Sequence, residues 1–257
     1  MRVVQHFVTA SVAVALSIAP AIARGQSTEF RYSGDHGPSH WSETPGWETC
    51  AGTTSGARQS PIDIDQVTAD RTLAPLRVRA QATPVALVNN GHTVEEEYAP
   101  GSVVIVGGAS FELAQFHFHS PAEHTVHGRH DALELHAVFA EPRSSKKVVI
   151  AQLYGVGGSN PFLARLLAER LPTKVGEHVE NAHRVNVADA FVSLAHYFTY
   201  DGSLTTPPCS ETVTWFVLER EGHLSQEQAK AFHDVLGANA RPIQGINHRT
   251  VRATASQ

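Results

Sequence analysis

The sequence of 257 residues has no run of basic residues and no acidic tail. Its 20 lysine and arginine residues are balanced by 25 acidic residues, and the net charge is −5 with neutral histidines. Proteins that bind nucleic acid or an anionic membrane surface usually concentrate positive charge, so this balance gives no reason to expect either partner. With 42% hydrophobic and 18% charged residues, the chain has the composition of a folded globular protein.

Long apolar segments are scarce as well. One uncharged, mostly apolar run covers residues 7–19, after Arg2 and before Pro20 and the small residues Ala21-Ile22-Ala23. The run is shorter than the roughly 20 residues that a membrane span needs, whereas the positive start and the A-x-A pattern are typical of a cleaved secretory signal. We therefore expect export with removal of residues 1–23, and a mature domain comprising residues 24–257 with no membrane span.

Cysteine occurs only twice, at Cys50 and Cys209. An oxidising compartment outside the cytosol would favour one disulfide between them. Two buried free thiols are the alternative that the sequence leaves open.

No Ser/Gly tract, long proline-rich stretch or internal repeat divides the chain after residue 28, so we expect one domain. Short runs of β-branched and aromatic residues between turn-forming residues are typical of strands. They cover residues 85–88, 103–106, 111–119, 133–139, 148–154 and 212–218. Helical patterns are few, at residues 161–171, 189–197 and 225–236. The sequence predicts one β-dominated domain with a few short helices.

Histidine is abundant, with 16 residues, and two of them form a His-x-His pair. On a strand, side chains two apart share a face, so His117 and His119 project together with Gln115. Phe116 and Phe118 then point the other way. On a helix, two residues at this spacing lie on different sides and cannot easily share one metal ion. The strand interpretation therefore makes His117 and His119 a chelating pair.

A third histidine completes a candidate metal site. On the predicted strand at residues 133–139, His136 shares a face with Glu134, and it becomes the third ligand if the two strands are neighbours. Three neutral imidazoles suit Zn²⁺ and leave a fourth tetrahedral position open, as in catalytic sites. Gln115 and Glu134 each precede a ligand by two positions and can accept its other ring N–H. Ordinary surface histidines remain the alternative, which spacing alone does not exclude.

Several motifs occur in a characteristic order: QSPIDI (59–64), NNGHTV (89–94), QFHFH (115–119), EHTV (123–126), ELH (134–136) and SLTTPPC (203–209). Together they resemble the α-class carbonic anhydrases, and the resemblance extends over residues 32–249. It implies a mainly β (α+β) single domain around a large, twisted, mostly antiparallel central sheet with a few short peripheral helices. It also implies reversible hydration of carbon dioxide to bicarbonate and a proton.

By position, the resemblance implies His117, His119 and His136 as Zn²⁺ ligands, with Gln115 and Glu134 as hydrogen-bond partners of His117 and His136. Thr205 is similar to the threonine that accepts a hydrogen bond from zinc-bound hydroxide and donates one to a carboxylate, here Glu123. A hydroxyl that donates to Glu123 can only accept from the hydroxide, which agrees with that role.

The resemblance also implies a substrate pocket and a proton path. The pocket residues are Val138, Val149, Leu204 and Trp215 on its apolar wall, with Thr205 and Thr206 on its polar side. His92 resembles the proton shuttle, since an imidazole titrates near neutral pH. Asn90 and Tyr32 match positions that order the intervening water. Without the resemblance, His92 would be read as an exposed turn residue.

The sequence departs from the family pattern just after His92, where three acids follow at Glu95, Glu96 and Glu97. We expect the charge of Glu95 to raise the pKa of His92 and to alter anion affinity. The pair Cys50 and Cys209 matches the disulfide of secreted family members, and the expected location is the bacterial periplasm.

Three other functions compete with this interpretation. A non-enzymatic binding relative would lack one or more ligand histidines, and all three are present here. An esterase activity can accompany hydration, because the same hydroxide can attack activated esters. A periplasmic zinc buffer is suggested only by the number of histidines. The expected partners are carbon dioxide and bicarbonate, without nucleic acid; a homodimer is compatible with the resemblance, but no surface stripe identifies an interface.

Overall fold

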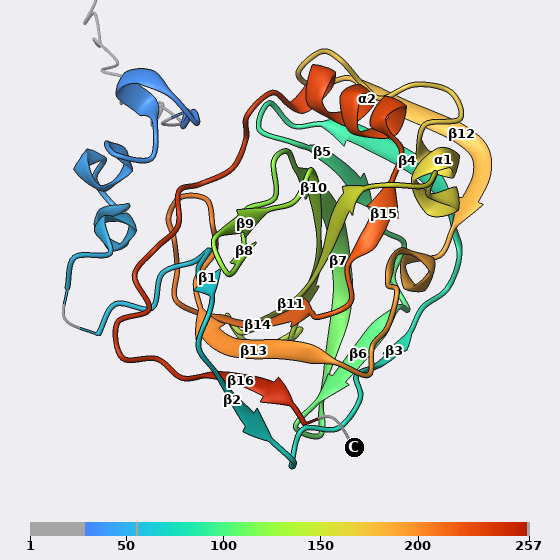
Figure 1. The fold of residues 1–257 in the computed structure, drawn as a ribbon. Coiled ribbons are helices and arrows are strands. Elements are labelled where there is room, and N and C mark those ends of the chain that lie inside the picture. The colour runs from blue at the N-terminus through green and yellow to red at the C-terminus, as the bar shows by residue number, and fades with distance from the viewer. Residues whose placement is uncertain (1–28, 55, 256–257) are drawn as a thin grey trace, which may run out of the picture.

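A mixed sheet of thirteen strands runs through the molecule, in the order β12-β4-β5-β7-β10-β11-β14-β13-β16-β2 along its main path (Figure 1). The strands β3, β6 and β15 pair at its sides, and β1, β8 and β9 form a separate small sheet. The computed structural model describes residues 29–54 and 56–255, so the signal sequence predicted at residues 1–23 lies outside the described residues. No helix in these two ranges has the length and apolar character needed to cross a membrane.

The strands are β1 (Asp63–Ile64), β2 (Val67–Asp70), β3 (Arg77–Arg79), β4 (Thr83–Asn89), β5 (Val94–Glu97), β6 (Val103–Val106), β7 (Ala109–His119), β8 (Thr125–Val126), β9 (Arg129–His130), β10 (Leu133–Ala140), β11 (Lys147–Val156), β12 (His178–Val185), β13 (Tyr197–Gly202), β14 (Val213–Leu218), β15 (Gly222–Leu224) and β16 (Val251–Thr254). The helices are α1 (Pro161–Leu166) and α2 (Gln226–Leu236), with 3₁₀ turns η1 (Gly34–His36), η2 (Trp41–Glu43), η3 (Glu48–Ala51) and η4 (Val187–Ala190).

Most neighbouring strands of the large sheet are antiparallel. The exceptions among the described strands are the parallel pairs β11–β14, β11–β15 and β16–β2. The predicted mainly β fold with a large central sheet and few helices is therefore confirmed, and all six predicted strand runs overlap strands of the structure.

The central sheet has two different faces at β7. Phe116 and Phe118 are fully buried and belong to the larger hydrophobic core. The helices α1 and α2 cover this face, because the ring of Phe116 packs against Phe162 of α1 and the ring of Phe118 against Phe232 of α2. The histidines between and after these phenylalanines therefore project from the opposite face, as strand alternation requires.

Two of the three predicted helices form. Asn160 caps α1 by accepting from the backbone of Phe162 and Leu163, and α2 begins with a capping box between Ser225 and Gln228. The third, predicted at residues 189–197, was wrong: the chain forms the short turn η4 and then enters β13 at Tyr197.

The failed helix has a physical explanation. Backbone groups in this segment bond to other parts of the chain instead of to the preceding turn. The amide of Val192 donates to the side chain of Gln152, and the carbonyl of Leu194 accepts from Leu76. Tertiary hydrogen bonds therefore outweigh the local helical spacing of the apolar residues.

The predicted disulfide is confirmed. Cys50, in η3, is bonded to Cys209, which lies 159 residues later in the loop after β13. Cys50 and Cys209 pack with the buried Trp41, so the disulfide ties the N-terminal segment to this loop.

A carboxyl group of β5 is buried in the protein interior. Glu96 has no exposed surface. Its Oε2 accepts from the backbone N–H of Ala86 at 2.8 Å, and its Oε1 is without a hydrogen-bond partner among the described residues. Burial, opposed by that hydrogen bond and reinforced by the charge of Glu97, raises the pKa of Glu96 to about 7.

We predict that replacing both cysteines by serine lowers the free energy of unfolding, by up to about 5 kcal/mol for so long a loop. The unfolded chain gains the freedom that the crosslink removes. Denaturant unfolding with and without a reducing agent measures this: reductant should bring the wild type toward the double variant and leave the variant unchanged. A wild type whose midpoint ignores reductant would contradict the prediction.

We also predict that Glu96 makes stability depend on pH. A carboxyl whose pKa is raised on folding contributes stability that is present below about pH 4.5 and is lost as the pH rises through about 7. The shift corresponds to roughly 3 kcal/mol at most. Glu96→Gln should therefore match the wild type near pH 5 and be more stable at pH 8, measured by urea unfolding. The exposed Glu180→Gln is the control, and equal pH slopes in wild type and Glu96→Gln would refute the assignment.

Candidate metal centre

The register of two neighbouring strands brings three histidines together. In the antiparallel pair of β7 and β10, His117 lies opposite His136, and His119 lies opposite Glu134. Their ring centroids are 4.6–5.2 Å apart. His119 and His136 are buried and His117 is partly exposed, so solvent reaches the cluster beside His117.

Hydrogen bonds determine which ring nitrogen of each histidine carries the proton. A neutral imidazole has one N–H and one lone pair, and a carbonyl or carboxylate oxygen can only accept. The Nδ1 of His117 donates to Gln115 Oε1 at 2.8 Å, and the Nδ1 of His119 donates to the backbone carbonyl of Asn239 at 2.8 Å. The Nε2 of His136 donates to Glu134 Oε1 at 2.7 Å.

The remaining lone pairs are therefore on Nε2 of His117, Nε2 of His119 and Nδ1 of His136. One ligand atom from each of the three residues lies within 4.8 Å of the others. The Nε2 of His119 is buried without a hydrogen-bond partner among the described residues. Three converging lone pairs with one orphaned nitrogen fit a tetrahedral metal ion that retains one open position.

The local electrostatics favour the neutral imidazoles that a metal requires. Burial, together with the neighbouring His119 and His136, holds the pKa of His117 well below its ordinary value. Burial also lowers the pKa of His119, although the nearby carboxylate of Glu123 opposes this.

Glu134 lies behind the three histidines and orients His136. This fully buried carboxylate accepts four hydrogen bonds, from the backbone amides of Glu123 and His124 and from the rings of His124 and His136. Burial alone would raise the pKa of Glu134, but these hydrogen bonds and the adjacent imidazoles hold it well below its usual value. An ionised Glu134 keeps the N–H of His136 on Nε2 and its lone pair directed at the cluster.

The polar network continues away from the histidine cluster. His124 donates from Nδ1 to Glu134, and its Nε2 lies 2.7 Å from the hydroxyl of Tyr200. That hydroxyl lies 3.0 Å from Oγ of Ser60, which also accepts from the backbone of Ser203. His136 is therefore connected through buried groups to the loop that follows Ser203.

The carboxylate of Glu123 is held by a backbone group. Its Oε1 accepts from the backbone N–H of Arg241 at 2.8 Å. Its Oε2 is buried and unpartnered, so the hydrogen bond expected from Thr205 is not formed among the described residues. Thr205 is nevertheless buried, with 5% of its surface exposed, and Oε2 of Glu123 is an acceptor that still needs a donor.

The residues expected to form the apolar wall lie in one row across the sheet. Val138 is opposite Val149, and Val149 is opposite Trp215. All three pack with Leu204 in a second hydrophobic cluster. The indole N–H of Trp215 donates to the carbonyl of Ser203 at 3.1 Å, which connects the wall to the loop carrying Leu204. Thr206 is partly exposed, and its carbonyl accepts from Cys209.

His92 lies on a turn between β4 and β5 and is partly exposed. Its ring stacks on Phe30 with a centroid distance of 3.7 Å and an interplanar angle of 11°. The side-chain oxygen of Asn90 accepts from the backbone N–H of His92 at 3.0 Å, so Asn90 shapes this turn. Tyr32 is half-buried, and burial together with the charge of Glu123 raises its pKa well above the ordinary value.

The prediction that the charge of Glu95 raises the pKa of His92 was wrong, both in the direction of the shift and in the residue responsible. Burial lowers the pKa of His92, and the nearby acid that opposes this shift is Glu29 rather than Glu95. Glu95 projects beside His117, its partner in the strand register, and its Oε2 accepts from Asn90 at 3.4 Å. Its influence on anion affinity stays a prediction.

Sequence reasoning missed several residues of the site. The carbonyl of Asn239 accepts from His119 across a separation of 120 residues, and a backbone acceptor has no residue-type signature. Arg241 was missed for the same reason, because its backbone N–H holds Glu123. Tyr200 lies on β13, a strand that the sequence analysis did not predict, and only the folded chain shows that its hydroxyl reaches His124.

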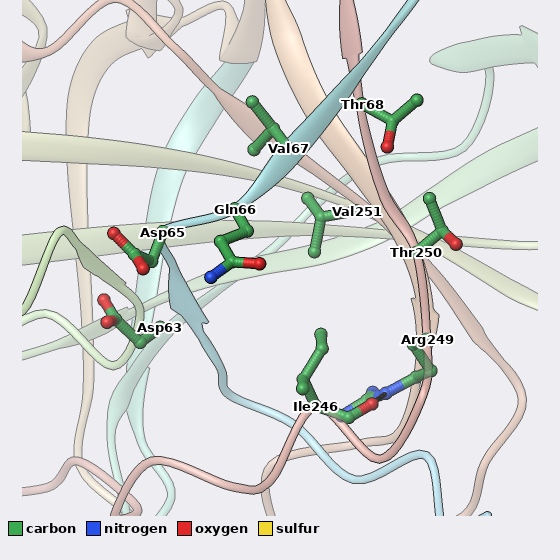
Figure 2. A pocket seen from close by; sticks show the side chains of 9 residues that line it. All are labelled: Asp63, Asp65, Gln66, Val67, Thr68, Ile246, Arg249, Thr250 and Val251. Atoms are coloured by element: carbon green, nitrogen blue, oxygen red, sulfur yellow. Dashed lines mark hydrogen bonds between the residues drawn. The ribbon is translucent and has the colours of Figure 1, made fainter.

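A separate surface hollow of about 500 Å³ lies beside β2 and β16 (Figure 2). Asp63 and Asp65 lie on one side of it and Arg249 on the other, with Val67 of β2 above them in this view. The guanidinium of Arg249 donates to the carbonyls of Ile246, Gly245 and Asp201. None of the predicted site residues lines this hollow.

Comparisons with known proteins agree with the geometry. The family model described as eukaryotic-type carbonic anhydrase matches residues 36–255. A carbonic anhydrase of Pectobacterium carotovorum is 33% identical over 243 residues, covering 94% of this chain and 97% of the relative. An α-carbonic anhydrase structure from Photobacterium profundum has 40% identity and a TM-score of 0.81, covering 87% of this chain and all of its own. One from Thermovibrio ammonificans, in complex with the inhibitor sulfanilamide, has 36% identity and a TM-score of 0.82, covering 87% of this chain and 98% of its own.

We predict that His117→Ala abolishes stoichiometric zinc binding and leaves the fold intact, because the larger core lies on the other face of the sheet. Metal analysis after dialysis, with far-UV circular dichroism, checks both parts. His178→Ala, which removes an exposed histidine of β12, is the control and should retain zinc. Zinc retained by His117→Ala would show that the ion binds elsewhere.

Proposed function

The chain belongs to the eukaryotic-type, or α-class, carbonic anhydrase family, and we propose that it hydrates carbon dioxide reversibly at a zinc ion held by His117, His119 and His136. The observation that carries the proposal is the convergence of three imidazole lone pairs, one of them on a buried nitrogen that has no hydrogen-bond partner in the described part of the chain. When bound, the zinc ion would lower the pKa of a coordinated water to about 7 and so supply a nucleophile at neutral pH.

The chain's own residues hold that geometry. Gln115, the carbonyl of Asn239 and Glu134 each accept the N–H of one histidine, so the three rings cannot rotate freely. Pre-oriented ligands reduce the reorganisation that the reaction would otherwise require.

Thr205 and Glu123 would orient the nucleophile. Glu123 Oε2 is a buried acceptor without a partner in residues 29–54 and 56–255, and Thr205 is a buried residue on the adjacent loop. Once Thr205 donates its single proton to Glu123, its oxygen can only accept from the attacking oxygen. This orientation directs a lone pair of the attacking oxygen toward the substrate carbon.

The apolar row of Val138, Val149 and Trp215, with Leu204, would receive carbon dioxide. Carbon dioxide has no hydrogen-bond donor, and an apolar wall imposes no desolvation cost on it. Bicarbonate is charged and leaves this wall readily, while Thr205 and Thr206 offer polar contacts on the loop side.

His92 would carry the released proton to solvent. An imidazole ordinarily titrates near neutral pH. Burial lowers the pKa of His92, whose ring stacks on Phe30, and this favours return of the proton to the buffer. The turn defined by Asn90 presents His92 at the surface, and Tyr32 lies near Glu123, where it can order water between the two regions.

We further propose export to the bacterial periplasm after removal of residues 1–23. The disulfide between Cys50 and Cys209 supports an oxidising compartment. Hydrolysis of small activated esters is proposed only as a side activity of the same nucleophile. A homodimer remains compatible with this function.

Stopped-flow measurement of carbon dioxide hydration tests the proposed function. The zinc-loaded protein should accelerate hydration, a chelator should abolish the acceleration, and added zinc should restore it. A folded protein that holds zinc without hydration activity would support a binding or storage role instead.

We predict that His92→Ala lowers kcat in weak buffer on the order of tenfold or more, with kcat/KM nearly unchanged. The proton leaves after bicarbonate, so only the maximal rate includes its transfer. Imidazole added as a buffer should restore part of kcat, and His178→Ala should behave as the wild type. Failure of imidazole to restore kcat would count against the shuttle.

A further inference from the structure

Asn239 uses all of its polar groups at one point beside the metal centre. Only 1% of its surface is exposed. Its carbonyl accepts from His119, its amide donates to the carbonyl of Ser120 at 3.3 Å, and its Oδ1 accepts from the amide of Ser120 at 2.8 Å. Its Nδ2 donates to the carbonyls of Phe118 at 3.0 Å and His92 at 3.1 Å.

The strand pairing explains why these groups need a partner. The ladder between β5 and β7 ends where Glu95 pairs with His117, because the chain before β5 turns away at residues 90–93. Backbone groups of Phe118 and Ser120 therefore extend beyond the ladder. Buried backbone groups must be paired, and the side chain of Asn239 takes the place of the missing strand.

The same side chain reaches the turn that carries His92. One amide group, Nδ2, is shared between the carbonyl of Phe118, next to the ligand His119, and the carbonyl of His92 itself. Two hydrogen bonds donated by a single buried nitrogen therefore link the turn to the strand that carries His119. Thr93 also links the turn to Phe118: its hydroxyl donates to the carbonyl of Phe118 at 2.5 Å and accepts from its amide at 3.3 Å.

We propose that the side chain of Asn239 is a positioning residue for proton transfer: it holds the His92 turn against the strand bearing His119. This role rests on the proposed function of His92 as the proton shuttle. It is separate from the carbonyl of Asn239, which orients His119 and survives any substitution of the side chain.

The test compares Asn239→Ala and Asn239→Asp with the wild-type zinc enzyme. Both variants lack the donor Nδ2, and the aspartate keeps an acceptor for Ser120, so it serves if the alanine variant fails to fold. We expect kcat in weak buffer to fall about tenfold and kcat/KM to stay within about twofold, with zinc retained. Imidazole buffer should restore kcat.

Gln228→Ala is the matched control. Gln228 is a buried amide that makes three hydrogen bonds to Asn160 and Ser225 at the helices, and removing it should cost comparable stability without changing kcat. A double-mutant cycle adds the decisive comparison. If Asn239 acts through His92, Asn239→Ala should cause no further loss of kcat in the His92→Ala background.

Two kinetic results would overturn the proposal: an equal fall of kcat and kcat/KM in Asn239→Ala, or the same fall in kcat with and without His92. Proton NMR titration of the His92 ring tests the positioning role of Asn239 separately from the proposed function. The pKa of His92 should shift toward its ordinary value in Asn239→Ala as the ring leaves Phe30, whether or not the enzyme hydrates carbon dioxide. An unchanged His92 titration would also overturn the proposal.

Discussion

The register between β7 and β10 is the constraint on which the rest of the site depends. It places His117 directly opposite His136 and His119 opposite Glu134. Because side chains alternate along a strand, a shift of one residue would turn the histidines of one strand into the core and expose its phenylalanines or leucines. The packing of Phe116 and Phe118 against α1 and α2 opposes that shift. Packing on the apolar face of β7 therefore fixes the positions of the histidines on its polar face.

The polar face consists of buried groups that would be costly if left unpaired. Glu134 is fully buried and remains ionised because it accepts hydrogen bonds from two amides and two imidazoles. From it, contacts extend through His124 and Tyr200 toward the loop that carries Thr205. Two atoms near this network, His119 Nε2 and Glu123 Oε2, have no hydrogen-bond partner among the described residues. A metal ion is proposed to bind at the first, and the second is proposed to accept from Thr205. A hydrogen-bonded polar network around two buried acceptors that lack a partner is the pattern expected of a functional site.

Much of this arrangement could be predicted from local sequence, and the rest could not for identifiable reasons. Alternation at residues 115–119 predicted both the shared face of the histidines and the burial of the phenylalanines, because strand geometry depends only on neighbours in sequence. Gln115 and Glu134 were predictable as partners since each lies two positions from its histidine. Asn239 was not, because its acceptor is a backbone carbonyl and its neighbour in space is 120 residues away. The pKa of His92 was misjudged because Glu95, close in sequence, turns toward His117, while burial against Phe30 dominates.

The central claim is that three imidazoles hold one zinc ion and leave one position to solvent. X-ray absorption at the zinc edge of the purified protein tests it most directly. The account predicts about three nitrogen neighbours at roughly 2.0–2.1 Å with imidazole outer-shell scattering, plus one oxygen that is replaced when an anion binds. A fourth protein nitrogen, a sulfur neighbour at about 2.3 Å, or a first shell that no anion alters would contradict it.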